Sequence, residues 1–337
     1  MKYQIVYHKE DNDGVMSGAL IKYYLINVMK VKESDIHLYG ATYIDLNFQW
    51  NTGNVSNWWH NDYDYIIMTD ISFNDIDAMK FLKKEFKKNF IWIDHHAPII
   101  SESIKHGFDD VEGWRDSGQS AIMNAYRYFF DTLNIARVER KDPVILRILS
   151  AWDSFSYKRE GYTIDYVEMI NLGMNQKCSI NIDKCYKLIP EFMQYDDHDD
   201  IWTNTDDYIK LLVELENSGY AVQQYNKERY KRIIDEYGDT SWFVDNNRRC
   251  IVLFLQDQTS SRMFECIEDN NIIKNGAVFK RTSLGKWTLS LYNIRVDDGF
   301  HCGNYLKSKY SGGGHVGAAG CTLTEEQFLE LLKTKKI

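Results

Sequence analysis

The chain has 337 residues, of which 44% are hydrophobic and 26% charged. This length and composition predict a globular protein of two domains, each with its own core. A net charge of -9 argues against a protein that holds long DNA or RNA, because such proteins carry a basic surface. The charge suits a short anionic substrate held by a few cations.

The cysteines and the hydropathy pattern indicate the cellular compartment of the protein. The six cysteines form no C-x-x-C pair and no zinc-type spacing, which predicts reduced thiols. No signal-peptide core and no apolar run of transmembrane length is present. We therefore expect a cytoplasmic protein that makes no use of a membrane. The cysteines are residues 178, 185, 250, 266, 302 and 321.

The N-terminal segment combines a strand with an acidic turn. Residues 2–7 alternate as a strand does, and the strand ends at His8. Asp11 and Asp13 follow two positions apart, and Gly14 would let the next helix start close to a ligand. One Asp would be enough to cap that helix. Two Asp residues and a His favour a cation site at this turn.

Three more strands are predicted downstream, over residues 36–43, 63–70 and 90–93, with helical segments between them. This order predicts a parallel sheet covered by helices. Acidic residues and histidines recur where the strands end, and the carboxyl edge of such a sheet is where ligands bind. These residues are His8, Asp11, Asp13, Asp70, Asp94, His95 and His96.

Beyond residue 100 the pattern is helical. One helix is expected from about residue 117 to 130, and another from Pro143 to Asp153. A carboxylate at a helix C-terminus is poorly matched to the helix dipole, so Asp153 is either solvent-exposed or bound to a cation. The acidic run 196–200 lacks apolar neighbours, which favours a solvated turn over a metal site. A long connecting helix is expected to end near Tyr237.

The C-terminal part returns to a mixed pattern. Strands are predicted over 241–244 and 251–255, a helix over 260–267, and a hairpin over 277–281 and 286–292. The segment Gly312-Gly313-Gly314-His315 follows. Successive backbone N–H groups of such a segment can form an anion nest, although a flexible loop is the alternative. The expected fold class is α/β, with a parallel-sheet N-terminal domain, a helical extension and a smaller α/β C-terminal domain.

Five motifs in this order resemble the DHH phosphoesterase family with its DHH-associated C-terminal domain, over most of the chain. The resemblance implies a catalytic domain over 1–190, a helical connector over 191–238 and a substrate-binding domain over 239–337. The motifs are Asp11-Asn12-Asp13-Gly14, Asp70, Asp94-His95-His96, Asp153 and Gly312-Gly313-Gly314-His315.

The resemblance also implies two divalent cations, Mn²⁺ or Mg²⁺, bound at the carboxyl edge of the sheet. One cation would be held by one His and one Asp, the other by two Asp and one His, and a further Asp would bridge them. His8 and Asp11 would hold the first cation. Asp13, His95 and Asp153 would hold the second, and Asp70 would bridge the two.

Other roles follow from the same resemblance. Asp94 would orient a ligand, His96 would face the substrate, and His315 with the glycines would close over a phosphate. Where the family has Ser-Leu-Arg, this chain has Ser290-Leu291-Tyr292. We therefore expect Arg295 or Arg281 to replace that arginine, or Tyr292 to stack on a base.

The function implied is a two-metal phosphodiesterase that hydrolyses short oligonucleotides or cyclic or linear dinucleotides to 5′-mononucleotides. A single-strand-specific exonuclease of the RecJ type is the enzymatic alternative. The non-enzymatic alternative is a protein that binds a nucleotide signal without cleaving it. A pyrophosphatase is disfavoured, because that branch lacks the glycine-rich loop with His. The oligomeric state stays open, with a homodimer as one option.

Overall fold

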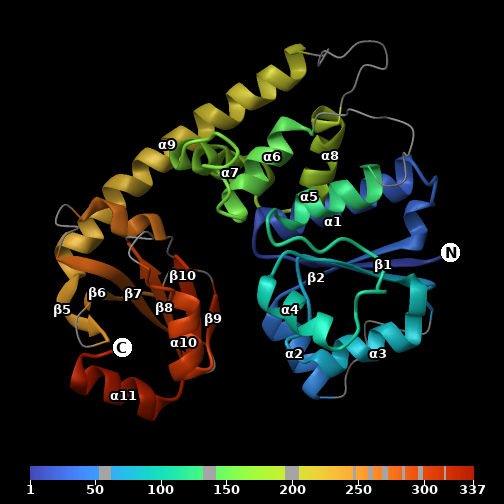
Figure 1. Ribbon diagram of the computed structural model, residues 1–337. Coiled ribbons are helices and arrows are strands. Elements are labelled where there is room, and N and C mark those ends of the chain that lie inside the picture. The colour runs from blue at the N-terminus through green and yellow to red at the C-terminus, as the bar shows by residue number, and fades with distance from the viewer. Residues whose placement is uncertain are drawn as a thin grey trace. The chain divides into compact units, whose positions relative to one another are not determined.

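A computed structural model describes residues 1–52, 62–131, 142–193, 205–245, 248–256, 261–267, 272–282, 285–294, 299–314 and 316–337. The acidic run 196–200, Arg295 and His315 lie outside these residues. The chain divides into two compact units, Met1–Gln223 and Gln224–Ile337. Figure 1 shows the elements of both units.

The first unit is built on a four-stranded parallel sheet with the order β2-β1-β3-β4. The strands are β1 (Tyr3–His8), β2 (Ile36–Ala41), β3 (Tyr65–Thr69) and β4 (Phe90–Ile93). The helices are α1 (Asn12–Asn27), α2 (Tyr43–Asn51), α3 (Ile76–Phe86), α4 (Ala97–Lys105), α5 (Ala121–Tyr126), α6 (Val144–Asp153), α7 (Ile164–Cys178), α8 (Ile182–Phe192) and the first part of α9 (Thr205–Tyr237).

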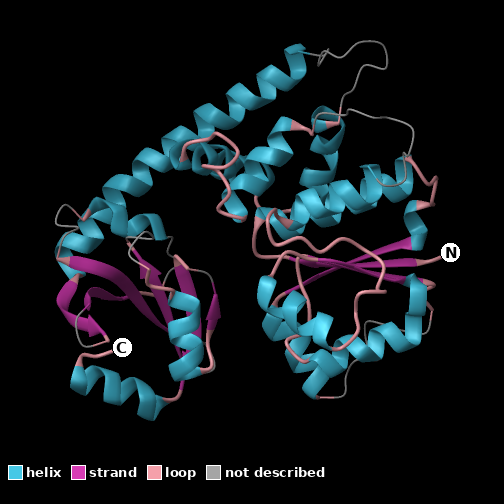
Figure 2. Cartoon of the chain, in the orientation of Figure 1, coloured by secondary structure: helices cyan, strands magenta, loops and turns pink. Residues whose placement is uncertain are grey.

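Helices cover both faces of this sheet (Figure 2), because its strands are apolar on both sides. In β4, Ile91 and Ile93 face the core formed with α1 and α5 to α8. Phe90 and Trp92 face the opposite core, formed with α2, α3 and α4. Strands buried on both faces are typical of parallel sheets. The expected α/β architecture is confirmed.

The second unit contains a mixed six-stranded sheet with the order β5-β6-β7-β8-β10-β9. One face packs on two helices, α10 and α11, and the other on the end of α9 and a short 3₁₀ helix at Ser261–Cys266. The predicted hairpin is confirmed as antiparallel β7 and β8. The elements are β5 (Asp239–Val244), β6 (Arg248–Phe254), β7 (Ile273–Arg281), β8 (Trp287–Asn293), α10 (Cys302–Tyr310), β9 (Gly313–Gly314), β10 (Ala318–Leu323) and α11 (Glu325–Thr334).

Several element boundaries differ from the sequence prediction, among them the end of β2 and the start of α1. The second strand ends at Ala41 and not at Tyr43, since Thr42 caps helix α2. The Thr42 hydroxyl accepts from the Asp45 backbone, and the Asp45 side chain accepts from the Thr42 backbone, which forms a capping box. Helix α1 begins at Asn12, inside the predicted acidic turn.

The six cysteines are free, and four of them are buried. Among the described residues, no helix combines the length and the apolar character that crossing a bilayer needs.

Candidate metal centre

The candidate residues of the first unit come from separate elements that meet at one edge of the parallel sheet. Asp70 follows β3 and His95 follows β4, while Asp13 lies in the first turn of α1 and Asp153 is the last residue of α6. Asp13, Asp70 and His95 are buried and Asp153 is partly buried. Helix and strand ends thus bring together residues up to 140 positions apart.

The first motif turn is shaped by close backbone contact. Asp11 caps helix α1 by accepting a hydrogen bond from the backbone N–H of Gly14 at 3.0 Å. A β-carbon at residue 14 would lie 2.2 Å from the carbonyl oxygen of His8, so only glycine lets α1 start against the end of β1. His8 Nε2 lies 3.6 Å from Asp11 Oδ2. Asp11 therefore serves as a helix cap and still faces His8.

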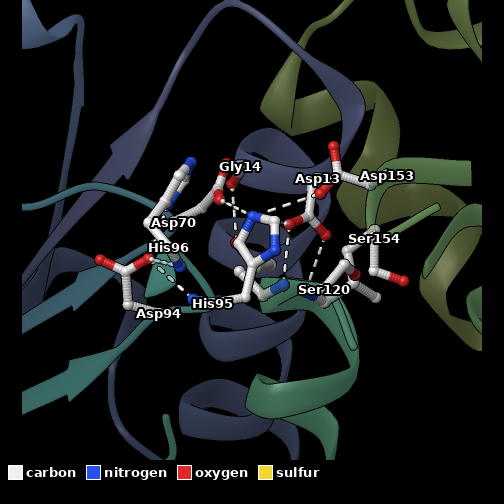
Figure 3. A network of polar contacts seen from close by, with 12 residues as sticks. Asp13, Gly14, Asp70, Asp94, His95, His96, Ser120, Asp153 and Ser154 are labelled. Atoms are coloured by element: carbon white, nitrogen blue, oxygen red, sulfur yellow. Dashed lines mark hydrogen bonds and ion pairs between the residues drawn. The ribbon is translucent and has the colours of Figure 1, made fainter. Parts of the chain in front are cut away.

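His95 lies at the centre of the cluster (Figure 3). Its Nε2 atom is 3.2 Å from Asp70 Oδ1, 3.2 Å from Asp153 Oδ2 and 3.7 Å from Asp13 Oδ2. An imidazole nitrogen carries at most one hydrogen, so it cannot satisfy three carboxylates. Among the described residues, Asp70 Oδ1 and Asp153 Oδ2 are buried oxygen atoms without a hydrogen-bond partner.

The electrostatics of the cluster follow from this crowding. Burial and then the charge of Asp13 raise the pKa of Asp70 well above its usual value. The same two causes, in the same order, raise the pKa of Asp153 to about 8. Burial would lower the pKa of His95, but the charges of Asp153 and Asp13 outweigh it and raise that pKa. The protein alone therefore holds too much negative charge here to keep every carboxylate ionised.

Asp70 is also held in an unusual backbone conformation, with a φ of +57°. Residues other than glycine seldom adopt the left-handed region, and such strain gathers at functional sites. Its backbone N–H donates to the carbonyl oxygen of Ile93 at 3.1 Å. This bond ties the residue after β3 to the end of β4 and directs the Asp70 carboxylate toward His95.

Asp13 has a second task that its sequence position does not reveal. Its two carboxylate oxygens accept hydrogen bonds from the backbone N–H groups of Ala121 and Ile122, at 2.7 and 2.8 Å. These residues start helix α5, so Asp13 supplies the cap that Ser120 does not provide. Each oxygen keeps a second lone pair, and Oδ2 also faces His95.

Asp94 orients its neighbours. Its Oδ1 atom accepts from the backbone N–H groups of His95 and His96, at 2.7 and 3.0 Å, and lies 2.7 Å from His96 Nδ1. Burial would raise the pKa of Asp94, but the charge of His96 outweighs it and lowers that pKa. Burial would lower the pKa of His96, yet the charge of Asp94 raises it to about 9. The pair fixes Nδ1 of His96 and leaves Nε2 for another partner.

The side chains form two groups that could hold a metal ion. One group is Asp13, His95 and Asp153, and the other is Asp70, His95 and His96, each with its ligand atoms within 4.8 Å of one another. A cation would supply the partners that the buried oxygens lack. Carboxylate and imidazole ligands suit Mn²⁺ or Mg²⁺, with some overlap with zinc. The donor set therefore fits the divalent cations that the resemblance implies.

In the second unit the glycine segment has a structural explanation. A β-carbon at Gly303 of α10 would lie 2.2 Å from the carbonyl oxygen of Gly314, and one at Gly312 would lie 2.6 Å from the carbonyl oxygen of Gly320. Gly314 has a φ of +141°. These glycines allow β9 to fit between α10 and β10. Their expected contact with a phosphate stays a prediction.

The residues of this unit that are expected to contact the substrate do not all lie close together. Tyr292 pairs with Ala318, and Gly314 pairs with the next residue of β10. Arg281 pairs with Trp287 at the other end of β8, five residues or about 17 Å from Tyr292. Tyr292 therefore lies near the glycine segment, but its ring packs at 5.4 Å from that of Phe264. Arg281 lies away from the segment.

Some residues of the centre were not found from the sequence. Trp92 Nε1 donates to Asp94 Oδ2 at 3.1 Å, and Asn124 Nδ2 donates to the Asp94 carbonyl oxygen at 2.9 Å. The Tyr43 ring lies beside those of His8 and His96. Only Tyr43 left a usable signal, because Thr42 and Asp45 have the spacing of a capping box.

Comparison with known proteins gives matches in structure only. No protein-family model and no curated protein sequence matches the chain. An uncharacterized protein from Helicobacter pylori G27 matches with 13% identity and a TM-score of 0.41, covering 99% of this chain and 98% of that one.

Two further solved structures match to a similar degree. A pGpG-specific phosphodiesterase from Vibrio cholerae has 12% identity and a TM-score of 0.43, covering 99% of this chain and 97% of that one. An exopolyphosphatase-related protein from Bacteroides fragilis has 14% identity and a TM-score of 0.42, covering 99% and 91%. At these TM-scores the matches carry no argument about function.

Proposed function

We propose that the protein is a metal-dependent phosphodiesterase acting on short oligonucleotides or on cyclic or linear dinucleotides, with 5′-mononucleotides as products. One observation carries the proposal. Three carboxylates, of Asp13, Asp70 and Asp153, surround one imidazole nitrogen of His95 in a largely buried site. Such a group of charges is costly unless cations are bound to it.

The motifs that resemble the DHH phosphoesterases support the choice of reaction. Divalent cations at this centre would supply Lewis acidity toward phosphoryl oxygens. Asp13, His95 and Asp153 would hold one cation, His8 and Asp11 the other, and Asp70 would contact both. The residues of the chain then have separate tasks: Asp94 keeps His96 oriented through Nδ1, and the Nε2 atom of His96 remains to contact the substrate. The cytoplasmic location and the homodimer stay predictions.

The test is product release from a nucleotide panel by the full-length protein. The panel contains linear and cyclic dinucleotides, each with Mn²⁺, with Mg²⁺ or with a chelator, and products are identified by mass. We expect 5′-mononucleotides with a divalent cation and none with chelator. Asp70→Asn should lower turnover more than about 100-fold, because a shared ligand is lost. The control is Asp77→Asn, since Asp77 is exposed on α3 and pairs only with Lys80 among the described contacts.

Two results would contradict the proposal. One is the same product release in chelator as in Mn²⁺, which would show that the acidic centre needs no cation. The other is wild-type turnover by Asp70→Asn at saturating Mn²⁺. Binding of dinucleotides in Mn²⁺ without any product would favour the alternative function, in which the protein binds a nucleotide signal without cleaving it.

A further inference from the structure

Tyr43 is placed beside the acidic centre by polar contacts at the start of helix α2. The capping box of Thr42 and Asp45 fixes Tyr43, the residue after Thr42, at the first helical position. Lys9, which lies in the first motif turn, extends its Nζ atom to 2.7 Å from Asp45 Oδ2. The turn that carries His8 and Asp11 therefore also holds the helix that begins with Tyr43.

The Tyr43 side chain lies against two histidines of the centre. Its ring centroid is 5.5 Å from that of His8 and 6.0 Å from that of His96, in an edge arrangement with the latter. Its hydroxyl lies 3.4 Å from His96 Nδ1. The shorter contact of Nδ1 is the one to Asp94 at 2.7 Å. Because a carboxylate can only accept, Nδ1 carries the hydrogen, and the Tyr43 hydroxyl cannot donate to it.

The surroundings of the Tyr43 hydroxyl are acidic. Burial and then the charge of Asp94 raise its pKa well above the usual value, and Asp70, Asp11 and Asp153 add to this. The phenol oxygen thus lies near the candidate ligands, and its O–H group is a hydrogen-bond donor. A neutral O–H group can approach an anion in such a place without adding charge of its own. The nearby cationic side chain, that of Lys9, forms an ion pair with Asp45.

We propose that Tyr43 is a catalytic residue whose hydroxyl donates a hydrogen bond to a non-bridging oxygen of the phosphoryl group in the acidic centre. The inference rests on the proposed function and adds a residue to it. Charge on the equatorial oxygens of a phosphoryl group is stabilised by positioned donors. A fixed donor that meets this charge acts mainly on the transition state, so its loss should appear in kcat more than in KM.

The test compares Tyr43→Phe with Tyr39→Phe. Both variants lose one hydroxyl and keep the ring. Tyr39 lies on β2, outside the acidic centre, and its hydroxyl accepts a hydrogen bond from Gln49 Nε2 at 2.7 Å. For the dinucleotide with the highest turnover in Mn²⁺, Tyr43→Phe should lower kcat about 10- to 100-fold, with a smaller change in KM. Tyr39→Phe should stay within about twofold of the wild type. Mn²⁺ affinity, measured by calorimetry, should be unchanged in both variants.

Other outcomes would overturn the inference. Wild-type kcat in Tyr43→Phe would show that the hydroxyl does not contact the phosphoryl group. A loss of Mn²⁺ affinity in parallel with kcat would show that Tyr43 acts through His8 or His96. If the wild type hydrolyses no dinucleotide, the proposed function fails, and binding of inorganic phosphate in Mn²⁺ then tests Tyr43 separately. Weaker phosphate binding by Tyr43→Phe than by Tyr39→Phe would support the contact, and equal binding would refute it.

Discussion

Single residues decide the chemistry of the acidic centre. Asp70 and Asp153 each place a buried oxygen without a hydrogen-bond partner, among the described residues, at 3.2 Å from His95. Asp13 shares its carboxylate between the start of α5 and the same histidine. A stable fold gains little from such crowding, because ionised carboxylates repel one another and lose their hydration. The arrangement is understandable as a preformed place for cations.

The same residues predict how stability depends on pH in chelator. The pKa of Asp153 is raised from 3.8 to about 8, so folding loses stability as pH rises from about 4 to 8. The pKa of His96 is raised from 6.5 to about 9, so its contribution is complete below 6.5 and is lost as pH rises through 9. Both groups make the cation-free protein less stable at pH 9 than at pH 6.5.

Urea unfolding at several pH values, in chelator and in Mn²⁺, measures this dependence. Mn²⁺ should flatten the curve, because a bound cation stabilises the ionised carboxylates over the same range. Stability in chelator that is constant or rises between pH 6.5 and 9 would contradict the assignment of the charges.

At the scale of elements, glycines determine how α7 and α9 pack. A β-carbon at Gly173 of α7 would lie 2.2 Å from the carbonyl oxygen of Leu215, and one at Gly219 of α9 would lie 1.8 Å from that of Met169. The two helices therefore approach through backbone contact. Lys177 and Gln223 add polar contacts across the same pair, with Glu214 and Glu168.

Gly219→Ala tests this packing. Replacing a helical glycine by alanine usually adds about 1 kcal/mol of stability. Here a backbone carbonyl blocks the methyl group and cannot rotate away, so we expect a net loss of about 1–3 kcal/mol, measured as the urea midpoint. Asn217→Ala is the control, since residue 217 is exposed on the same helix, and it should be neutral or slightly stabilising. A more stable Gly219→Ala protein would exclude close packing here.

The sequence predicted the elements that have strong local signals. The parallel strands and their acidic ends were found because apolar runs stop at Asp70 and Asp94, and the sheet brings such ends together. The capping of α5 by Asp13 could not be found, because it joins residues 108 and 109 positions apart. Periodicity alone does not place Tyr43, because the residues around it continue the pattern of β2, and only the capping box of Thr42 and Asp45 marks the end of the strand.

Over the whole molecule, charge is divided unevenly between the two units. Residues 1–223 contain 35 Asp and Glu against 23 Lys and Arg, whereas residues 224–337 contain 14 against 17. The first unit has a net charge of -12 and the second of +3. An unneutralised acidic unit repels a polyanion, and the repulsion grows with the number of phosphates.

This distribution predicts a preference for short substrates. In Mn²⁺ we expect a higher kcat/KM for a dinucleotide than for a single strand of about 20 nucleotides, since a strand of that length needs a basic groove along its backbone. Competition between the two substrates in one reaction gives the ratio directly. A ratio in favour of the long strand, with processive release of mononucleotides, would favour the exonuclease of the RecJ type.

Helix α9 has a consequence for dissecting the protein into fragments. Leu211 and Leu215 belong to the core of the first unit, and Tyr230 belongs to a core of the second, yet all three lie on one continuous helix. The division between Gln223 and Gln224 thus cuts hydrogen-bonded turns, and a gene split there would leave both products with a frayed terminus. Truncation libraries should therefore retain residues 205–237 intact in each half, and loss of solubility on cutting at 223 would say nothing about the acidic centre.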